Sequence, residues 1–167
     1  MLIYHPAFDA YHCVFRMLAL AVALKEAEID LLRICDFYLT FPSAIATVRL
    51  PSGMAHGRQI AKAAANIYRD PINPKNVFRD MTEIQTSALR NIAASGFIDL
   101  DLFEKGKLKI ISSNTMPEQI KEKISNFKIS SGQTFEFLVK ELSAIPLQGI
   151  NGLKHRTDLL EYRYDIN

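Results

Sequence analysis

Residues 84–110 read IQTSALRNIAASGFIDLDLFEKGKLKI, and this stretch decides the predicted fold. In its first half, apolar residues recur three or four positions apart, which predicts a helix over Phe78–Ser95. After Gly96 the apolar residues alternate in Phe97–Phe103 and again in Lys107–Ile110, which predicts a β-hairpin with a glycine turn. A helix, a glycine, a strand, a short turn and a strand are typical of the second half of a winged helix-turn-helix.

The remainder of the chain is predicted to be helical. Asp9 precedes an apolar stretch, Val14–Leu24, which predicts a helix over Ala10–Ala27 that is buried on several sides. Further helices are expected at Ile29–Phe41, at Arg58–Tyr68, after the capping signals Thr115–Glu118 and Ser130–Gln133, and at Asn151–Tyr162. The predicted fold is mainly α with a small β-hairpin: a winged helix-turn-helix core with helical additions at both ends.

Length and composition indicate one globular domain, or one core with an appendage. The chain has 167 residues, of which 49% are hydrophobic and 23% charged, and these proportions exclude collagen-like and disordered classes. We expect residues 1–112 to form the winged-helix-like domain. Residues 113–167 would form a C-terminal helical extension that packs on, or bridges to, partner proteins.

The compartment is expected to be the cytoplasm. The longest apolar run, Met17–Leu24, stops at Lys25 and is far shorter than the roughly 20 residues of a membrane span. No basic segment leads into it as a signal peptide would require. Cys13 and Cys35 lie in apolar patterns without a CxxC motif, which favours a reducing compartment.

The middle third is the only mildly basic region and supplies the candidate DNA contacts. Residues 51–112 contain nine Lys or Arg and six Asp or Glu, a net charge of +3 within a chain of net charge +2. Candidate contacts lie on the predicted recognition helix and wing: Arg90, Asn91, Lys105, Lys107 and Lys109.

DNA contact is one of three roles that stay open for these residues. Gln85 and Asn91 have side chains that can read base edges, but Asp80 and Glu83 would face phosphates unfavourably. Lysines on the hairpin also protect a solvated edge strand, and a winged helix can dock on protein instead of DNA.

Arg16 is the most informative charge in the first predicted helix. A guanidinium in a nearly all-apolar helix must find a partner or reach the surface, because an unpaired buried charge is costly. Asp36 in the next helix is the predicted partner, with Asp9 as the second choice. An Arg16–Asp36 ion pair would lock two helices together.

No catalytic, metal-binding or cofactor-binding constellation emerges. His5, Asp9, His12 and Cys13 are close in sequence, but a metal site needs about four convergent ligands, and structural packing is the favoured interpretation. Cys35 lies on an apolar helix face and is expected to be a buried small residue, not a nucleophile. The sequence therefore predicts a protein that is not an enzyme and has no cofactor.

Three stretches carry a resemblance to a known family. They are YHPAFDAYHCVFR at residues 4–16, LLRICDFYLTFP at residues 31–42, and IQTSAL at residues 84–89 followed by GFID at residues 96–99. Together they resemble the middle component of bacterial ABC-three-component systems, over about residues 4–111. The tail from Ser112 is less distinctive.

The resemblance implies a structural subunit in a prokaryotic antiphage defence complex of the Lamassu type. Such a middle component links an SMC- or Rad50-like ABC ATPase that senses DNA to an effector, often a nuclease. It implies no small-molecule substrate, and DNA contact mainly through the complex. The expected partner surfaces are the two ends of the chain: Tyr4, His5, Phe8, Leu153, Leu160, Tyr162 and Tyr164.

Two alternatives remain. One is a free-standing winged-helix transcription regulator that forms a homodimer and binds DNA with a steep salt dependence. The other is a small enzyme, which no paired carboxylates, nucleophile motif or phosphate loop supports.

Overall fold

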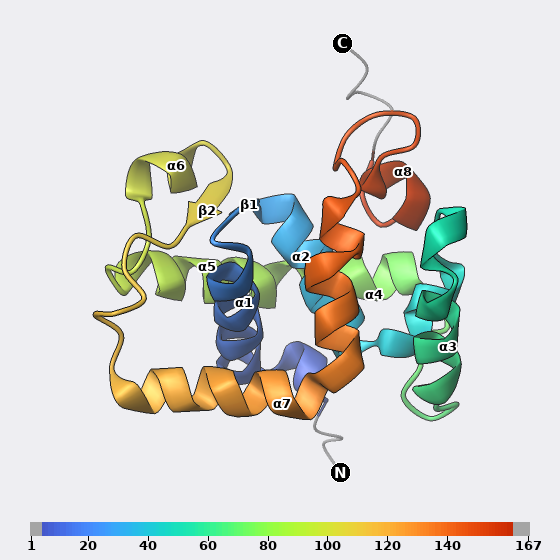
Figure 1. Cartoon of the computed structure of the whole chain (residues 1–167), viewed down its shortest axis with the longest axis horizontal. Helices are drawn as coiled ribbons and strands as arrows, with labels where there is room; N and C mark the ends of the chain where they lie inside the picture. Colours follow the sequence, from blue (N-terminus) through green and yellow to red (C-terminus); the bar gives the residue numbers. More distant parts are fainter. Residues whose placement is uncertain (1–4, 162–167) are drawn as a thin grey trace. The chain divides into compact units, whose positions relative to one another are not determined.

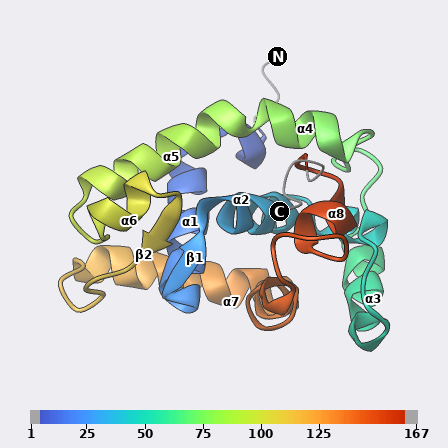
Figure 2. The ribbon, with the colours of Figure 1, turned by 90° about the horizontal axis from the view of Figure 1, so that it is seen from above.

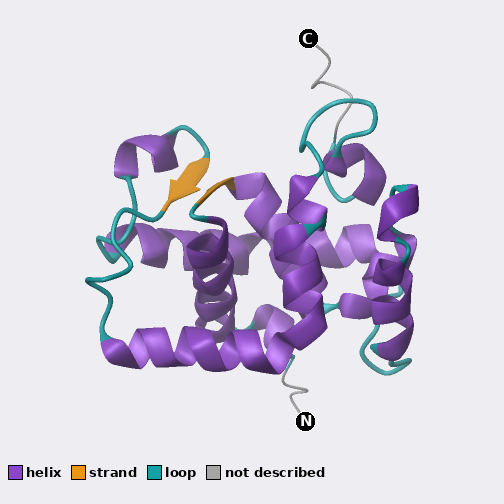
Figure 3. Ribbon diagram, in the orientation of Figure 1, coloured by secondary structure: helices purple, strands orange, loops and turns teal. Residues whose placement is uncertain are grey.

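The computed structural model describes residues 5–161, and this part of the chain is mainly helical with one small antiparallel sheet (Figure 1, Figure 3). The chain divides into two compact units. Unit 1 comprises Met1–Asp36 and Met81–Gly132, and unit 2 comprises Phe37–Asp80 and Gln133–Asn167. The predicted boundary after residue 112 stays a prediction, because a spatial division does not establish which segments fold independently.

The elements of each unit follow in chain order. In unit 1 they are η1 (Pro6–Phe8), α1 (Ala10–Leu24), β1 (Glu26–Glu28), the first part of α2 (Ile29–Thr40), α5 (Thr82–Ala94), α6 (Leu100–Glu104), β2 (Lys107–Lys109) and the first part of α7 (Glu118–Lys140). In unit 2 they are the ends of α2 and α7 together with η2 (Pro42–Thr47), η3 (Ser52–Met54), α3 (His56–Ala63), α4 (Pro74–Asp80), η4 (Leu142–Ala144) and α8 (Leu153–Thr157).

The sheet of unit 1 joins segments that are far apart in sequence. Strands β1 and β2 pair antiparallel, with Ala27 opposite Leu108, and both side chains are buried (Figure 2). On its other edge the β2 segment forms an isolated antiparallel bridge between Ile110 and Ile98. The β2 segment is therefore hydrogen-bonded on both sides, by β1 and by the residues that follow α5.

The predicted strand Phe97–Phe103 is wrong over most of its length, because Leu100–Glu104 forms helix α6. Asp99 caps this helix, its carboxylate accepting a hydrogen bond from the Leu102 backbone N–H at 3.0 Å. The cap outweighs the alternating pattern, and only Ile98 takes part in strand pairing. The predicted strand after Gly106 does form, but its main partner is β1.

Helix α1 ends earlier than predicted, at Leu24 and not at Ala27. Lys25 adopts a positive φ of 66°, which a helix cannot continue, and its carbonyl accepts a hydrogen bond from the Ile110 N–H. The glycine predicted to end the helix before the hairpin behaves as expected, since Gly96 has a φ of 81° directly after α5.

The core of unit 1 forms where α1 packs against α5 and the sheet. Helix α1 is buried along most of its length, as its apolar sequence predicts. Its side chains share this core with those of α2, α5 and β2, including Met17, Leu20, Leu32, Ile34, Ala88, Ile92 and Leu108. Within residues 5–161 no helix is both long and apolar enough to cross a bilayer.

The core of unit 2 is built on aromatic rings. Phe37 lies edge-on to Phe78, with 5.8 Å between ring centroids, and also contacts Phe41. Helix α3 packs on η2, and its Gly57 lies close against the side chains of Phe137 and Leu50. A Cβ on Gly57 would lie 2.7 Å from the ring of Phe137, so a larger residue there would force the core apart.

Three predicted helices differ in extent. The helix predicted over Phe78–Ser95 is interrupted at Met81, which separates α4 from α5. The predicted third helix ends at Ala63 instead of Tyr68, and the predicted final helix is reduced to α8. Helix α7 is interrupted by Gly132, with φ 47° and ψ −124°, within the stretch predicted to begin a new helix.

Candidate functional site

A buried ion pair in unit 1 joins the first two helices, as the sequence pattern predicts. The Nε of Arg16 lies 2.6 Å from Oδ1 of Asp36, and the two side chains are almost completely buried. The Arg16 guanidinium also donates to the carbonyl of Pro6 at 3.0 Å. Its charge is thereby compensated and hydrogen-bonded inside the protein, which is the condition for burying a charge.

Gln85 on α5 extends this ion pair into a network, which sequence reasoning missed. Its Nε2 donates to Oδ2 of Asp36 at 3.0 Å, and its Oε1 accepts from Nε of Arg33 at 3.0 Å. The expectation that Gln85 reads base edges is therefore wrong, because its side chain is fully buried. The sequence did contain a signal of this burial, because Gln85 lies at helical spacing from Met81 and Ala88, which are both buried.

The two cysteines of unit 1 are poor nucleophiles. Burial raises the pKa of the Cys13 thiol to about 12, and the Asp36 carboxylate 3.8 Å away adds to the rise. Burial likewise raises the pKa of Cys35 to about 12. Burial alone lowers the pKa of Arg16, but the Asp36 carboxylate more than offsets this and the net shift is upward. At neutral pH the network holds two neutral thiols and one compensated ion pair.

The N-terminal cluster of His5, Asp9, His12 and Cys13 has structural contacts. The Asp9 carboxylate caps α1, accepting from the His12 backbone N–H at 2.9 Å, and lies 3.0 Å from the His12 ring. The His5 ring accepts a hydrogen bond from the Ala7 N–H. Among residues 5–161 no three His, Cys, Asp or Glu side chains gather as a metal ion would require.

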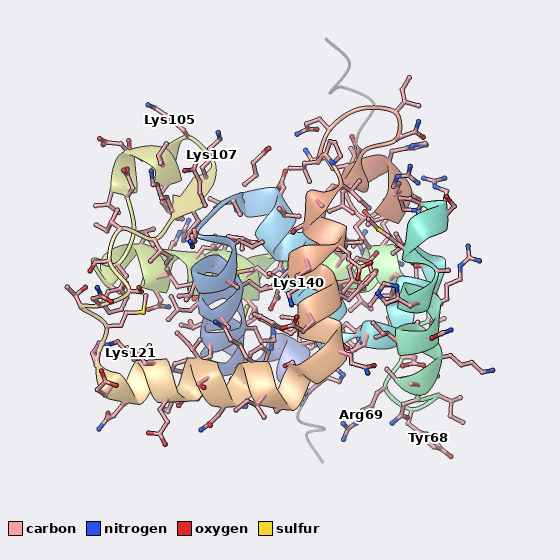
Figure 4. All side chains as sticks on the ribbon, in the orientation of Figure 1. Tyr68, Arg69, Lys105, Lys107, Lys121 and Lys140 are labelled. Atoms are coloured by element: carbon pink, nitrogen blue, oxygen red, sulfur yellow. The ribbon has the colours of Figure 1, made fainter. Side chains whose placement is uncertain are left out.

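The predicted DNA contacts are on the surface of unit 1 but differ in their availability. Arg90 and Asn91 are exposed on α5, although the Asn91 amide donates to the carbonyl of Ser87. Lys105 and Lys107 are exposed where α6 leads into β2 (Figure 4). Lys109 forms an ion pair with its cross-strand neighbour Glu26, at 3.6 Å.

The residues predicted to form partner surfaces at the chain ends differ in their exposure to solvent. Phe8 is half exposed, and His5 is half-buried. The prediction that Leu153 lies on a partner surface is wrong. Its side chain, at the start of α8, is fully buried in the core of unit 2. Leu160 is half-buried. Tyr4, Tyr162 and Tyr164 lie outside the described residues.

The most exposed apolar side chains lie elsewhere, on residues 66–72, here called the apolar loop. Ile67 is 87% exposed, Tyr68 is 91% exposed and Ile72 is fully exposed. Figure 4 shows Tyr68 and the adjacent Arg69 at the edge of unit 2, with side chains directed away from the ribbon. Three large apolar side chains exposed within one short loop make it a candidate surface for a protein contact.

The apolar loop is held in one conformation by polar contacts at its base. The Asp70 carboxylate accepts hydrogen bonds from the hydroxyl of Ser43 at 2.7 Å and from the Asn66 N–H at 2.8 Å. The Asn66 side chain in turn accepts from the Tyr68 N–H at 3.0 Å. Ile67 and Tyr68 are therefore presented by a fixed turn, which reduces the entropy lost on binding.

The segment of chain that precedes the apolar loop is positively charged. Arg58 and Lys62 on α3 and Arg69 in the loop are exposed, and no Asp or Glu occurs anywhere between Phe37 and Arg69. The Asp70 carboxylate, which follows directly, is engaged by the loop itself. A surface complementary to this region would be apolar at its centre and acidic at its rim.

Comparison with protein families gives one match. The family model described as ABC-three component (ABC-3C) system Middle Component 5 matches residues 2–165. The chain belongs to this family. No curated protein and no solved structure matches it. As an ABC-3C middle component, the protein is a component of a multi-subunit system, which agrees with the resemblance drawn from residues 4–111.

The apolar loop of this middle component could have been noticed in its sequence. Ile72 lies among the turn-forming residues between two predicted helices, where the chain runs at the surface and apolar side chains stay exposed. The predicted third helix, Arg58–Tyr68, concealed Ile67 and Tyr68, because it placed them inside a helix instead of in this loop.

Proposed function

We propose that this middle component is a non-catalytic adaptor of a prokaryotic antiphage defence complex. In this proposal it links an SMC- or Rad50-like ABC ATPase to a nuclease-type effector in the cytoplasm. The observation that carries the proposal is the family match over residues 2–165, because a component of a multi-subunit system must contact other subunits. A relationship to Lamassu systems is the more specific form of the same proposal.

The chemistry of unit 1 supports a structural role. Two charged groups and both thiols of its first two helices are buried close to one another. Arg16 and Asp36 compensate each other's charge, and the thiols of Cys13 and Cys35 have pKa values near 12. These groups fix helices in place and are not poised for reaction.

The apolar loop is the surface that we propose for docking on another protein of the system. Its partner would offer an apolar pocket for Ile67 and Tyr68, with carboxylates near Arg69 and the exposed cations of α3. A protein partner is favoured over nucleic acid because two isoleucines, which neither stack on bases nor bind phosphates, lie at the centre of the surface.

The experiment is purification of the complex from the native operon with wild-type or variant middle component. Ile67→Asp should cause loss of at least one large subunit, because a carboxylate would be buried in an apolar contact. Ile150→Asp is the matched control, since Ile150 is 70% exposed in unit 2 and lies outside the apolar loop. Retention of every subunit by Ile67→Asp would refute docking through this loop.

A second candidate function, DNA contact through a winged helix, is favoured by the element order of unit 1. Its order begins with helix α1, strand β1 and helix α2, and continues with helix α5. Two chain segments after α5 pair with each other through Ile98 and Ile110. Strand β2, in the second of these segments, also pairs with β1. In this proposal α5 is the recognition helix, residues 37–80 are inserted before it, and Lys105 and Lys107 lie on the wing.

The DNA proposal is tested by binding of a duplex at several salt concentrations. Replacement of both Lys105 and Lys107 by Glu should lower the affinity and flatten its salt dependence, because two phosphate contacts are lost. A symmetric dimer with tight sequence-specific binding would instead support the alternative of a transcription regulator. Unchanged affinity in the double variant would exclude the wing from DNA contact.

A further inference from the structure

A cavity of about 350 Å³, open to solvent, lies in unit 2. Its lining comes from the chain around η2, from the start of α4 and from the end of α8. The side chains that decide its character are Arg49, Lys75, Arg156 and Asp158. No aromatic side chain lines it, so it offers charge and hydrogen bonds instead of a stacking surface.

The two arginines are held in place by backbone carbonyls. The guanidinium of Arg156 donates through Nε to the carbonyl of Asn151 at 2.7 Å and through Nη1 to the carbonyl of Arg49 at 2.6 Å. The guanidinium of Arg49 donates to the carbonyl of His155, and its backbone N–H donates to the carbonyl of Arg156. The arginines, which are far apart in sequence, therefore fix each other's position in unit 2.

These contacts orient the guanidiniums without cancelling their charge. Carbonyl groups are neutral, and neither arginine has a carboxylate partner among residues 5–161. A guanidinium also carries more N–H donors than these contacts use. Holding two like charges at one cavity is unfavourable in the empty protein, and an anion between them relieves the repulsion.

The remaining charges leave the cavity clearly positive. Lys75 and Asp158 form a loose ion pair at 3.6 Å, with side chains that are 54% and 64% exposed. One carboxylate against two guanidiniums and one ammonium leaves a net charge of +2. The volume lies at the lower end of the range for small-molecule sites.

We propose that this cavity binds a phosphate group, clamped between Arg49 and Arg156 with Lys75 as a third cation. Phosphate is favoured because it is multiply charged and matches the planar fork of arginine, whereas a single carboxylate would leave excess positive charge. The same chemistry is presented by a free phosphorylated ligand and by the backbone of a nucleic acid. The inference concerns unit 2 alone and does not depend on the adaptor role.

The test measures binding of three probes to the full chain by calorimetry at low ionic strength, where charge effects are least screened. The probes are inorganic phosphate, adenosine monophosphate and a single-stranded DNA oligonucleotide. Arg49→Gln should weaken binding by about fivefold, and Asp158→Asn should strengthen it by about threefold because the only carboxylate leaves the cavity. Asparagine tolerates the left-handed conformation of residue 158, where φ is 53°.

Arg58→Gln is the matched control, since Arg58 is an exposed arginine on α3 that does not line the cavity. If Arg49→Gln does not fold, Lys75→Gln takes its place, because Lys75 is largely exposed and its removal disturbs little structure. Equal affinity for phosphate and for adenosine monophosphate supports a free phosphorylated ligand. A much higher affinity for the oligonucleotide, lowered by Arg49→Gln and raised by Asp158→Asn, supports a nucleic-acid backbone. Binding of none of the probes, or equal weakening by Arg58→Gln, overturns the proposal.

Discussion

Arginines are held in opposite ways in the two units. In unit 1, Arg16 is buried against the Asp36 carboxylate, and Gln85 links the same carboxylate to α5. In unit 2, the partners of the Arg49 and Arg156 guanidiniums within residues 5–161 are neutral backbone carbonyls. Because a carboxylate cancels the charge and a carbonyl does not, the first arrangement stabilises the fold while the second keeps its charge available to a ligand.

The largest expected effect is on the ion pair of unit 1. Arg16→Met should lower the free energy of unfolding by about 3–5 kcal/mol, because it leaves the fully buried Asp36 carboxylate without its cation. Chemical denaturation of purified protein measures the loss. Replacement of both residues, Arg16→Met with Asp36→Leu, should recover much of the stability, since no unpaired charge then remains.

Over a single pH unit, a smaller effect is expected from each of the two buried thiols at alkaline pH. Their pKa values are raised to about 12 in the folded protein from an ordinary value of 9.0, so above about pH 9 the unfolded chain loses protons that the folded one retains. Each thiol should therefore reduce stability by up to about 1.4 kcal/mol per pH unit between pH 9 and 12. Denaturation curves at several pH values, compared between wild type and Cys35→Ala, test this, and an unchanged slope in the variant contradicts it.

The smallest expected effect is that of the same substitution in unit 2. Arg156→Met should cost only about 1 kcal/mol, since it removes hydrogen bonds to the carbonyls of Asn151 and Arg49 but strands no charge. Denaturation under the conditions used for Arg16→Met provides the comparison. An equal loss of unfolding free energy in Arg16→Met and Arg156→Met would contradict this difference between carboxylate and carbonyl partners.

Sequence patterns within the first predicted helix were enough to predict that most of it is buried. Arg16 stood out because it was charged in an apolar helix, and Asp36 followed as the nearest available carboxylate. The mainly helical fold and the left-handed Gly96 also followed from spacing and glycine geometry. The alternation in Phe97–Phe103 led to a wrong strand prediction, because the cap at Asp99 favours a helix over a strand.

Features that depend on distant contacts were not predictable. Strand β1 is three residues long, and its pairing with β2 joins positions about eighty residues apart. Arg49 and Arg156 are separated by 107 positions, so no sequence window contains both sides of the cavity. Gln85 was misjudged because an amide suits a solvated helix face as well as a buried network, and only the packing of α5 on its neighbours distinguishes them.

The central claim is that this middle component joins larger subunits of its system. The most direct measurement is affinity purification from the native operon, with subunits identified by mass spectrometry and the mass of the complex determined by light scattering. An adaptor should co-purify with a large ABC ATPase and an effector, and it should lose a subunit in Ile67→Asp but not in Ile150→Asp. Isolation of a homodimer with no large partner would contradict the adaptor role.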